Sequence, residues 1–260
     1  DARLRSGAPA SQRGRRPGGN TRAPRAGGMS NFWESSHCRR WLVPRTALPA
    51  GRDALIETTR WMVVLGCKAR MRQRVIATAI VLLRRFALAS GSDWDEYAPR
   101  AVGVACLYVA AKAEECPMQA KHWVRYASHH AGYVMQLPEL LELEMHVLEA
   151  LDACLVVFHP YRPLIQLVEK WGFTNCTQHA WSLVNDSYHT DLCLLYAPYV
   201  IAVAALYVAC VLKGQDLRQG FATLQVDLDE VYECARIMMD AYKKHSRAKA
   251  EAKAEAKTKA

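Results

Sequence analysis

The sequence predicts an all-α protein made of two tandem five-helix repeats with a short N-terminal helix ahead of them. Three observations carry this prediction: a 16-residue motif occurs twice, apolar residues recur at helical spacing, and no useful stretch alternates like a β-strand. The composition agrees, because 51% hydrophobic and 23% charged residues are ordinary values for a globular chain.

The repeated motif sets the length of one repeat. Tyr97–Lys112 reads YAPRAVGVACLYVAAK and Tyr196–Val211 reads YAPYVIAVAALYVACV, with nine of 16 positions identical. The copies lie 99 residues apart, so each repeat spans about 100 residues. We expect the Ala-rich motif helix at the centre of each repeat, because its small side chains let neighbouring helices approach closely.

Prolines help to place the helices. Each of four prolines stands just ahead of an apolar run, in the first helical turn where its missing N–H costs nothing; these are Pro99, Pro138, Pro163 and Pro198. We expect a short helix near 31–43, then helices near 53–67, 70–89, 98–115, 118–130 and 137–155. The second repeat should have helices near 161–172, 178–190, 198–213, 216–223 and 227–245. The predicted domains are 29–52, an N-terminal helix and linker, and two repeats at 53–157 and 158–245.

The net charge of +9 is concentrated at the two ends. Residues 1–28 carry +6 and residues 243–260 carry +5, which leaves −2 for 29–242. The basic, Gly- and Pro-rich segment 1–28 is expected to be disordered, and the change of composition at Met29 favours Met29 as the natural start. The basic Ala/Lys-rich tail 246–260 should be a fraying helix or disordered, because its i,i+4 neighbours are like-charged. A slightly acidic core does not support a DNA-reading face.

Cysteines and apolar runs exclude several other classes. The nine Cys contain no C-x-x-C pair and most lie in apolar runs, which indicates buried, reduced thiols and a reducing compartment. Leu192–Leu212 is uncharged over 21 residues, but its counterpart in the first repeat has only 11 uncharged residues between Arg100 and Lys112. That length is too short for a bilayer, so we expect no membrane span.

No nucleotide-binding, zinc-protease or hydrolase motif occurs, so the sequence favours a non-enzyme without cofactor or metal. Two charged residues stand out instead. Lys112 ends the motif helix where the second copy has Val211, although a Lys at a helix C-terminus is also favoured by the macrodipole.

Glu144 falls in phase with an expected apolar stripe, which consists of Leu137, Leu141, Leu148, Leu151 and Leu155. Burying a carboxylate is costly without partners. Glu144 is therefore expected either in an internal ion pair or facing a site that another chain fills. Lys112 and Glu144 could lie close together as a paired site on one face.

Local motifs match a known family. They are NFWESSH at 31–37, FHPYRPL at 158–164, VNDSY at 184–188 and TDLCLLY at 190–196. Together with a Lys ending helix three and a Glu in helix five of the first repeat, they resemble the cyclin family, and within it the cyclin of the Mediator kinase module. The resemblance covers roughly 29–245 and implies two cyclin boxes.

By this resemblance, the chain is a regulatory subunit that binds and activates a Mediator-associated cyclin-dependent kinase and regulates RNA polymerase II transcription in the nucleus. Its implied partners are that kinase and other Mediator subunits, with no sequence-specific nucleic acid and no membrane. Lys112 and Glu144 match the residues with which cyclins bind the kinase.

Two further sites follow from the resemblance. Trp181, Asn185 and Tyr242 match a surface groove in the second repeat; ordinary packing is the alternative for them. Phe32 and Trp33 match an N-terminal docking helix, and folding back on the chain's own core is their alternative. For the whole chain, another transcriptional cyclin or a TFIIB-like promoter-binding factor remains open, although the latter would want an N-terminal zinc ribbon and a basic second repeat.

Overall fold

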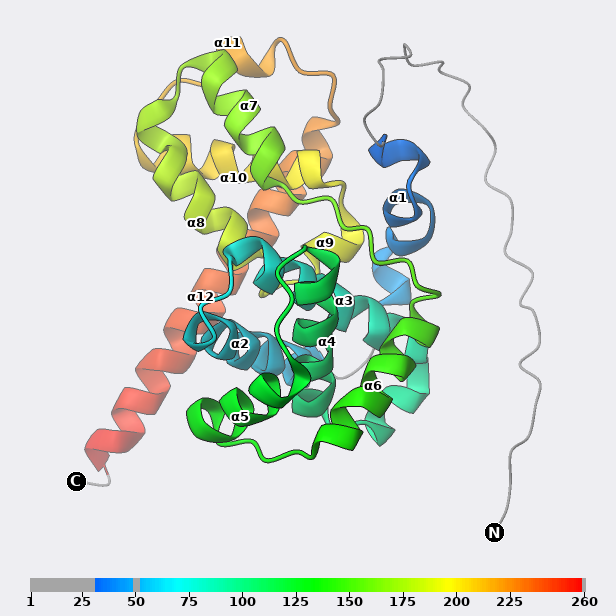
Figure 1. Cartoon of the computed structure of the whole chain (residues 1–260). Helices are drawn as coiled ribbons and strands as arrows, with labels where there is room; N and C mark the ends of the chain where they lie inside the picture. Colours follow the sequence, from blue (N-terminus) through cyan, green and yellow to red (C-terminus); the bar gives the residue numbers. More distant parts are fainter. Residues whose placement is uncertain (1–30, 49–51, 259–260) are drawn as a thin grey trace. The chain divides into compact units, whose positions relative to one another are not determined.

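The computed structural model describes residues 31–48 and 52–258, and all regular elements in these ranges are helices (Figure 1). The predicted all-α fold is thus confirmed. The expected disordered segment 1–28 lies outside the described residues. Within the described ranges, no helix has the length and apolarity that a membrane crossing would need.

The first repeat consists of five helices around α4. They are α2 (Arg52–Lys68), α3 (Gln73–Ser90), α4 (Pro99–Ala113), α5 (Ala120–Ala131) and α6 (Leu137–Ala150). The motif helix α4 packs against all four others and begins at Pro99, as expected. At Gly103 a Cβ would lie only 3.1 Å from Cγ of Met62 on α2. The small side chains of the motif are therefore what allows the close packing.

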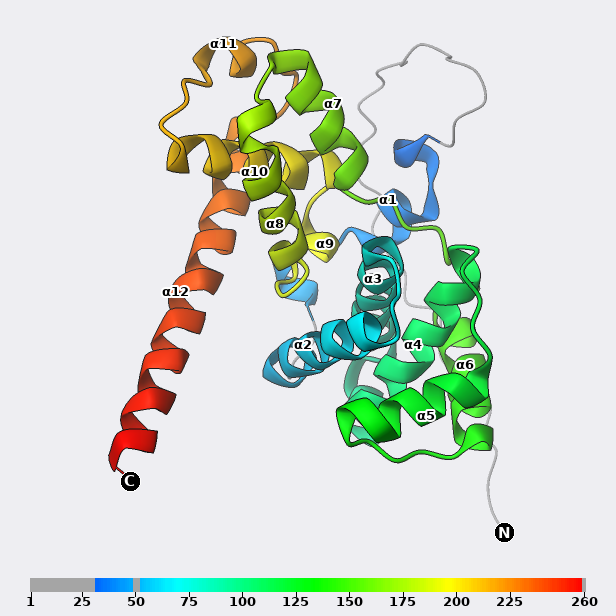
Figure 2. The ribbon, with the colours of Figure 1, turned by 60° about the vertical axis from the view of Figure 1, so that its left-hand side comes forward.

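The second repeat has the same plan around α10 (Figure 2). Its helices are α7 (Tyr161–Trp171), α8 (Thr177–Ser187), α10 (Pro198–Leu212), α11 (Arg218–Phe221) and α12 (Leu228–Thr258). The motif helix α10 packs against α7, α8 and α12, and its alanines Ala202, Ala204, Ala205 and Ala209 are buried. Both copies of the motif thus form the central helix of a repeat.

The N-terminal helix expected near 31–43 is divided into two pieces. A 3-10 turn, η1 (Phe32–Glu34), precedes α1 (Ser36–Trp41). Ser35 between them is extended, and its hydroxyl accepts a hydrogen bond from the Cys38 N–H as the cap of α1. The sequence did not predict α9 (Leu192–Leu195) or the short turns η2 (Arg45–Ala47), η3 (Gly91–Glu96) and η4 (Thr174–Cys176).

Helix α6 ends at Ala150, so the expected end near 155 was wrong. Asp152 and Ala153 have φ of +51° and +50°, in the left-handed region that stops a helix. The buried guanidinium of Arg85 then donates hydrogen bonds to the carbonyls of Cys154 (3.3 Å) and Val156 (3.2 Å). A buried arginine, rather than helical hydrogen bonding, therefore fixes the start of the linker between the repeats.

The C-terminal tail was expected to be either a fraying helix or disordered. It is helical, since α12 continues without a break to Thr258. Alanine, lysine and glutamate all have high helix propensity, which outweighs the weak like-charge pairs. The predicted boundary at 245 therefore falls inside a helix.

Polar groups join the two repeats. Arg84 of α3 is 1% exposed, forms an ion pair with Asp191 and donates to the Tyr188 carbonyl at 3.2 Å. In the linker, His159 places Nε2 2.8 Å from Thr78 Oγ1 and Nδ1 2.6 Å from the Tyr188 hydroxyl. These contacts connect α3 with the segment after α8, about 110 residues further along the chain.

Candidate functional site

The structure brings Lys112 and Glu144 together. Lys112 lies in the last turn of α4, Glu144 in the middle of α6, and the two helices pack against each other. The Lys112 ammonium forms an ion pair with the Glu144 carboxylate and lies 4.2 Å from the centre of the Tyr108 ring. The Lys112 side chain is 41% exposed and that of Glu144 is 11% exposed. The pair therefore sits at the surface, with its carboxylate inward and its ammonium outward.

The apolar stripe predicted for α6 was wrong in its details. Leu137 and Leu141 are 40% and 42% exposed rather than buried. The buried row is Leu140, Glu144, Val147 and Leu151. Leucines populate more than one face of α6, so sequence alone selected a neighbouring row. The burial of Glu144 was nevertheless predicted correctly.

The leucines that the stripe prediction misassigned form an exposed apolar row. Leu137, Leu141 and Met145 are spaced four apart on α6, and Met145 is 62% exposed. Residues four apart share one helix face, so the three side chains make a continuous strip next to Glu144. An apolar strip beside a partly buried ion pair has the composition of a protein–protein contact surface.

The candidate groove residues of the second repeat separate into two places. Trp181 and Asn185 share one face of α8, and both contact Tyr161 of α7. The ring centres of Trp181 and Tyr161 are 4.6 Å apart, and the Tyr161 hydroxyl donates to Asn185 Oδ1 at 2.9 Å. Tyr242 of α12 instead donates from its hydroxyl to Asp186. Asp186, the residue after Asn185 on α8, thus connects Tyr242 to this helix.

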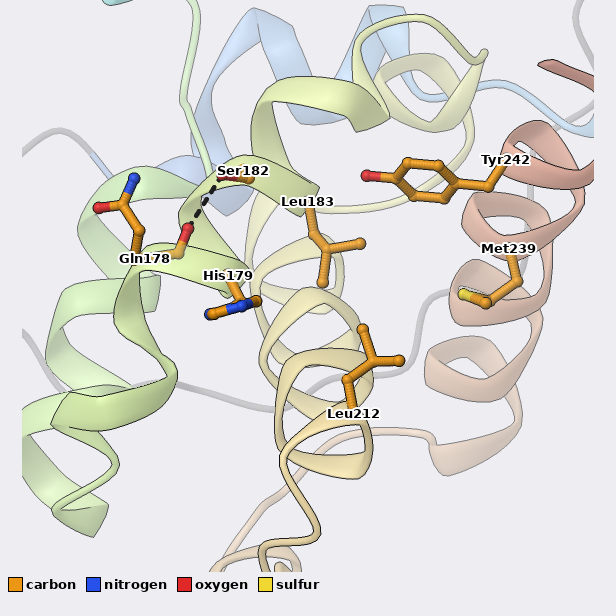
Figure 3. Close-up of a pocket in the computed structure, with 7 residues that line it drawn as sticks. All are labelled: Gln178, His179, Ser182, Leu183, Leu212, Met239 and Tyr242. Carbon is orange, nitrogen blue, oxygen red and sulfur yellow. Dashed lines mark hydrogen bonds between the residues drawn. The ribbon is translucent and has the colours of Figure 1, made fainter. Parts of the chain in front are cut away.

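A hollow of about 350 Å³ lies on the Tyr242 side of α8 (Figure 3). Its lining residues come from α8, α10 and α12: Gln178, His179, Ser182, Leu183, Leu212, Met239 and Tyr242. Burial raises the pKa of Tyr242, and so does the adjacent Asp186 carboxylate, so the phenol stays protonated as a hydrogen-bond donor.

Phe32 and Trp33 have different environments. Phe32 packs edge-on against Phe158 of the linker and against His37, with ring centres 5.5 Å and 5.4 Å away. Trp33 is 64% exposed. Phe32 therefore follows the alternative of folding back on the core, whereas Trp33 presents its ring to solvent.

The family model described as Cyclin, N-terminal domain matches residues 49–156. The chain is 40% identical over 232 residues to Cyclin-C1-1 of Oryza sativa subsp. japonica, covering 82% of this chain and 89% of that protein. It is 37% identical over 235 residues to Cyclin-C of Rattus norvegicus, covering 82% and 83%. The chain belongs to the cyclin C family.

Solved structures show the same cyclin fold at low sequence identity. A chain of the CAK complex of Chaetomium thermophilum bound to ATP-γ-S has a TM-score of 0.67 and 19% identity, covering 80% of this chain and 79% of that chain. A viral cyclin from herpesvirus saimiri has a TM-score of 0.61 and 17% identity, covering 74% and 86%. The two five-helix repeats are therefore cyclin boxes.

Membership in the cyclin C family decides the chain's general role. Cyclins are regulatory subunits of cyclin-dependent kinases, so this chain is a regulator and not itself a kinase. Among the residues that the structure describes, no group of three or more His, Cys, Asp or Glu could hold a metal ion. All nine cysteines are free thiols, and five of them are buried.

Sequence reasoning missed the apolar strip and one charged neighbour of the Lys112–Glu144 pair. Glu114, two residues after Lys112, accepts a hydrogen bond from Thr78 and forms an ion pair with Arg74 at 2.7 Å. The signal for the strip was present as the i,i+4 spacing of Leu137, Leu141 and Met145. This spacing alone does not tell whether the face is buried or exposed, and the sequence prediction assigned Leu137 and Leu141 to a buried face.

Proposed function

We propose that this cyclin binds and activates a Mediator-associated cyclin-dependent kinase, and that it acts in the nucleus on RNA polymerase II transcription. The observation that carries the proposal is the Lys112–Glu144 pair beside the exposed strip of Leu137, Leu141 and Met145. The proposal takes 53–157 and 158–245 as the two boxes and assigns kinase binding to the first.

The surface has the parts that such binding needs. The strip supplies apolar area that a partner helix can cover, and covering it stabilises the complex. The Lys112–Glu144 pair orients the partner, since the half-exposed ammonium can donate hydrogen bonds to the carbonyls at the end of a partner helix. Glu144 holds that ammonium in place before the partner arrives, which lowers the entropy lost on binding.

Activation then follows from packing. A protein kinase is active when its αC helix is held inward, so that the Lys–Glu ion pair of the kinase forms. A cyclin that binds only this conformation shifts the kinase population toward it. If the cyclin binds the active conformation of the kinase more tightly than the inactive one by a few kcal/mol, the active conformation becomes dominant.

We assign the docking of other Mediator subunits to the second box and the N-terminal segment. Trp181, Asn185 and Tyr242 are the proposed groove residues, and the hollow beside Tyr242 extends the surface toward α10. The exposed Trp33 ring is a second contact of this kind, with Phe32 as its anchor on the core.

The test is co-expression of the full chain with a Mediator-type cyclin-dependent kinase. Phosphorylation of a polymerase C-terminal repeat peptide is measured together with the affinity of the two proteins. We expect stable co-purification and raised kinase activity. Glu144→Ala should weaken binding at least roughly tenfold, because truncating a buried charge partner is costly at an interface.

Two variants separate binding from folding. Glu142→Ala removes an exposed carboxylate of the same helix and should bind normally. Met145→Glu changes an exposed side chain and cannot damage the core, yet it should also abolish tight binding. Equal kinase affinity for wild type, Glu144→Ala and Met145→Glu would show that the kinase binds another surface of the cyclin.

A further inference from the structure

Helix α5 presents a basic outer face that the proposed function does not use. Its sequence AKHWVRYASHHA contains one Lys, one Arg and three His, but no Asp or Glu. Lys121, Arg125 and His129 follow one another at four-residue spacing and are exposed, so they form a single row along the helix.

A hollow of about 430 Å³ opens in the second half of this face. Its walls are Arg125, Tyr126, His129 and His130. The rings of Tyr126 and His130 lie nearly parallel, with centres 5.3 Å apart and planes inclined by 30°. The basic row therefore runs beside a pair of stacked rings, against which an apolar or aromatic side chain can pack.

The positive charge of α5 is not compensated within the described parts of the chain. Several exposed arginines elsewhere are paired with carboxylates, as in Arg40–Asp152, Arg45–Glu233 and Arg100–Glu57. No carboxylate within the described residues forms an ion pair with Lys121 or Arg125. Unpaired surface cations attract a complementary acidic partner.

The chain's own ends are not complementary to this face. Residues 1–28 carry +6 and residues 243–260 carry +5, so either segment would be repelled by it. These two segments therefore do not supply an acidic occupant for α5.

We propose that the outer face of α5 docks an acidic peptide segment of a partner protein. Carboxylates of the peptide pair with Lys121 and Arg125, and a neighbouring apolar or aromatic side chain enters the hollow against Tyr126 and His130. Because α5 packs against α6, the docked segment lies beside the helix that carries the apolar strip (Figure 1). The proposal stands on α5 alone and does not require that the kinase assignment is correct.

The full chain is titrated into a fluorescently labelled short peptide that alternates Glu with Ala and contains one Tyr, and anisotropy is measured. We expect saturable binding that weakens as salt rises, since surface charge pairs are screened. A matched peptide with Gln in place of Glu should not bind. Arg125→Glu should weaken binding by roughly tenfold or more, because it replaces an attraction by a repulsion.

Control variants make the result specific to α5. Lys170→Glu introduces the same charge change on an exposed position of α7 and should leave binding unchanged. Arg125→Lys keeps the charge and should retain most of the affinity. Failure of wild type to bind the Glu peptide would overturn the proposal, as would equal loss in Lys170→Glu. Tighter binding of single-stranded DNA than of the Glu peptide would overturn it in favour of a nucleic-acid surface.

Discussion

Both ring nitrogens of His159 are engaged between the repeats. The Thr78 hydroxyl donates its proton to Glu114 at 2.7 Å, so it can only accept from His159 Nε2. In the neutral imidazole, which carries its one proton on Nε2, Nδ1 accepts from the Tyr188 hydroxyl at 2.6 Å. Burial lowers the pKa of His159 to about 3, with nearby Arg74 and Arg85 acting in the same direction.

We predict that stability falls with acidity between pH 6.5 and 3. Burial also lowers the pKa of His37 to about 3, from an ordinary value of 6.5. The unfolded chain takes up these protons first, so the stabilisation is complete above about pH 6.5 and is lost as the pH falls toward about 3. Each of the two histidines should lower the free energy of unfolding by up to about 1.4 kcal/mol per pH unit in that window.

Urea unfolding at a series of pH values measures this slope. His159→Gln should unfold more easily at neutral pH but show a shallower dependence on pH, because one of the two groups has been removed. A variant with the wild-type slope would show that His159 does not contribute.

At the scale of elements, the contact between α2 and α4 depends on Gly103. Its missing side chain leaves space for Met62 and for Thr58, whose Cγ2 would be 3.3 Å from an added Cβ. We predict that Gly103→Leu lowers the free energy of unfolding by about 1–3 kcal/mol, the usual cost of overpacking. Ala113→Leu is the matched control, since Ala113 is an exposed residue of the same helix. Comparable unfolding midpoints in urea for the two variants would refute the close-packing argument.

The elements also show what sequence could predict. Pro99, Pro198 and the repeated 16-residue motif predicted where α4 and α10 begin, because these signals are local in the sequence. Periodicity predicted that Glu144 lies on a buried row and left its pairing with Lys112 open, and the stripe around it was assigned to the wrong leucines. The end of α6 was misplaced, because Asp152 and Ala153 adopt the left-handed conformation and Arg85, far away in sequence, then binds the carbonyls of Cys154 and Val156. Long-range contacts of this kind leave no periodic signal.

At the scale of the whole molecule, the contact between the boxes depends on a buried charge. The Arg84 side chain is 1% exposed, and that of its partner Asp191 is 16% exposed. Asp191→Ala should destabilise the fold by about 3–5 kcal/mol, because it leaves a guanidinium buried without its counter-ion. Limited proteolysis of the linker should also become faster in this variant. Asp152→Ala, which removes an exposed ion pair with Arg40, should have little effect. Indistinguishable unfolding of the two variants would contradict a structural role for the Arg84 ion pair.

The two motif helices differ at their last aligned position, where α4 has Lys112 and α10 has Val211. Val211 is 56% exposed, so the second box has a bare apolar side chain where the first has an anchored cation. Duplication of the fold has therefore not duplicated the Lys112–Glu144 ion pair. On the proposed function, a chain with two cyclin boxes offers a single position to a kinase, and the stoichiometry of the assembly is one to one.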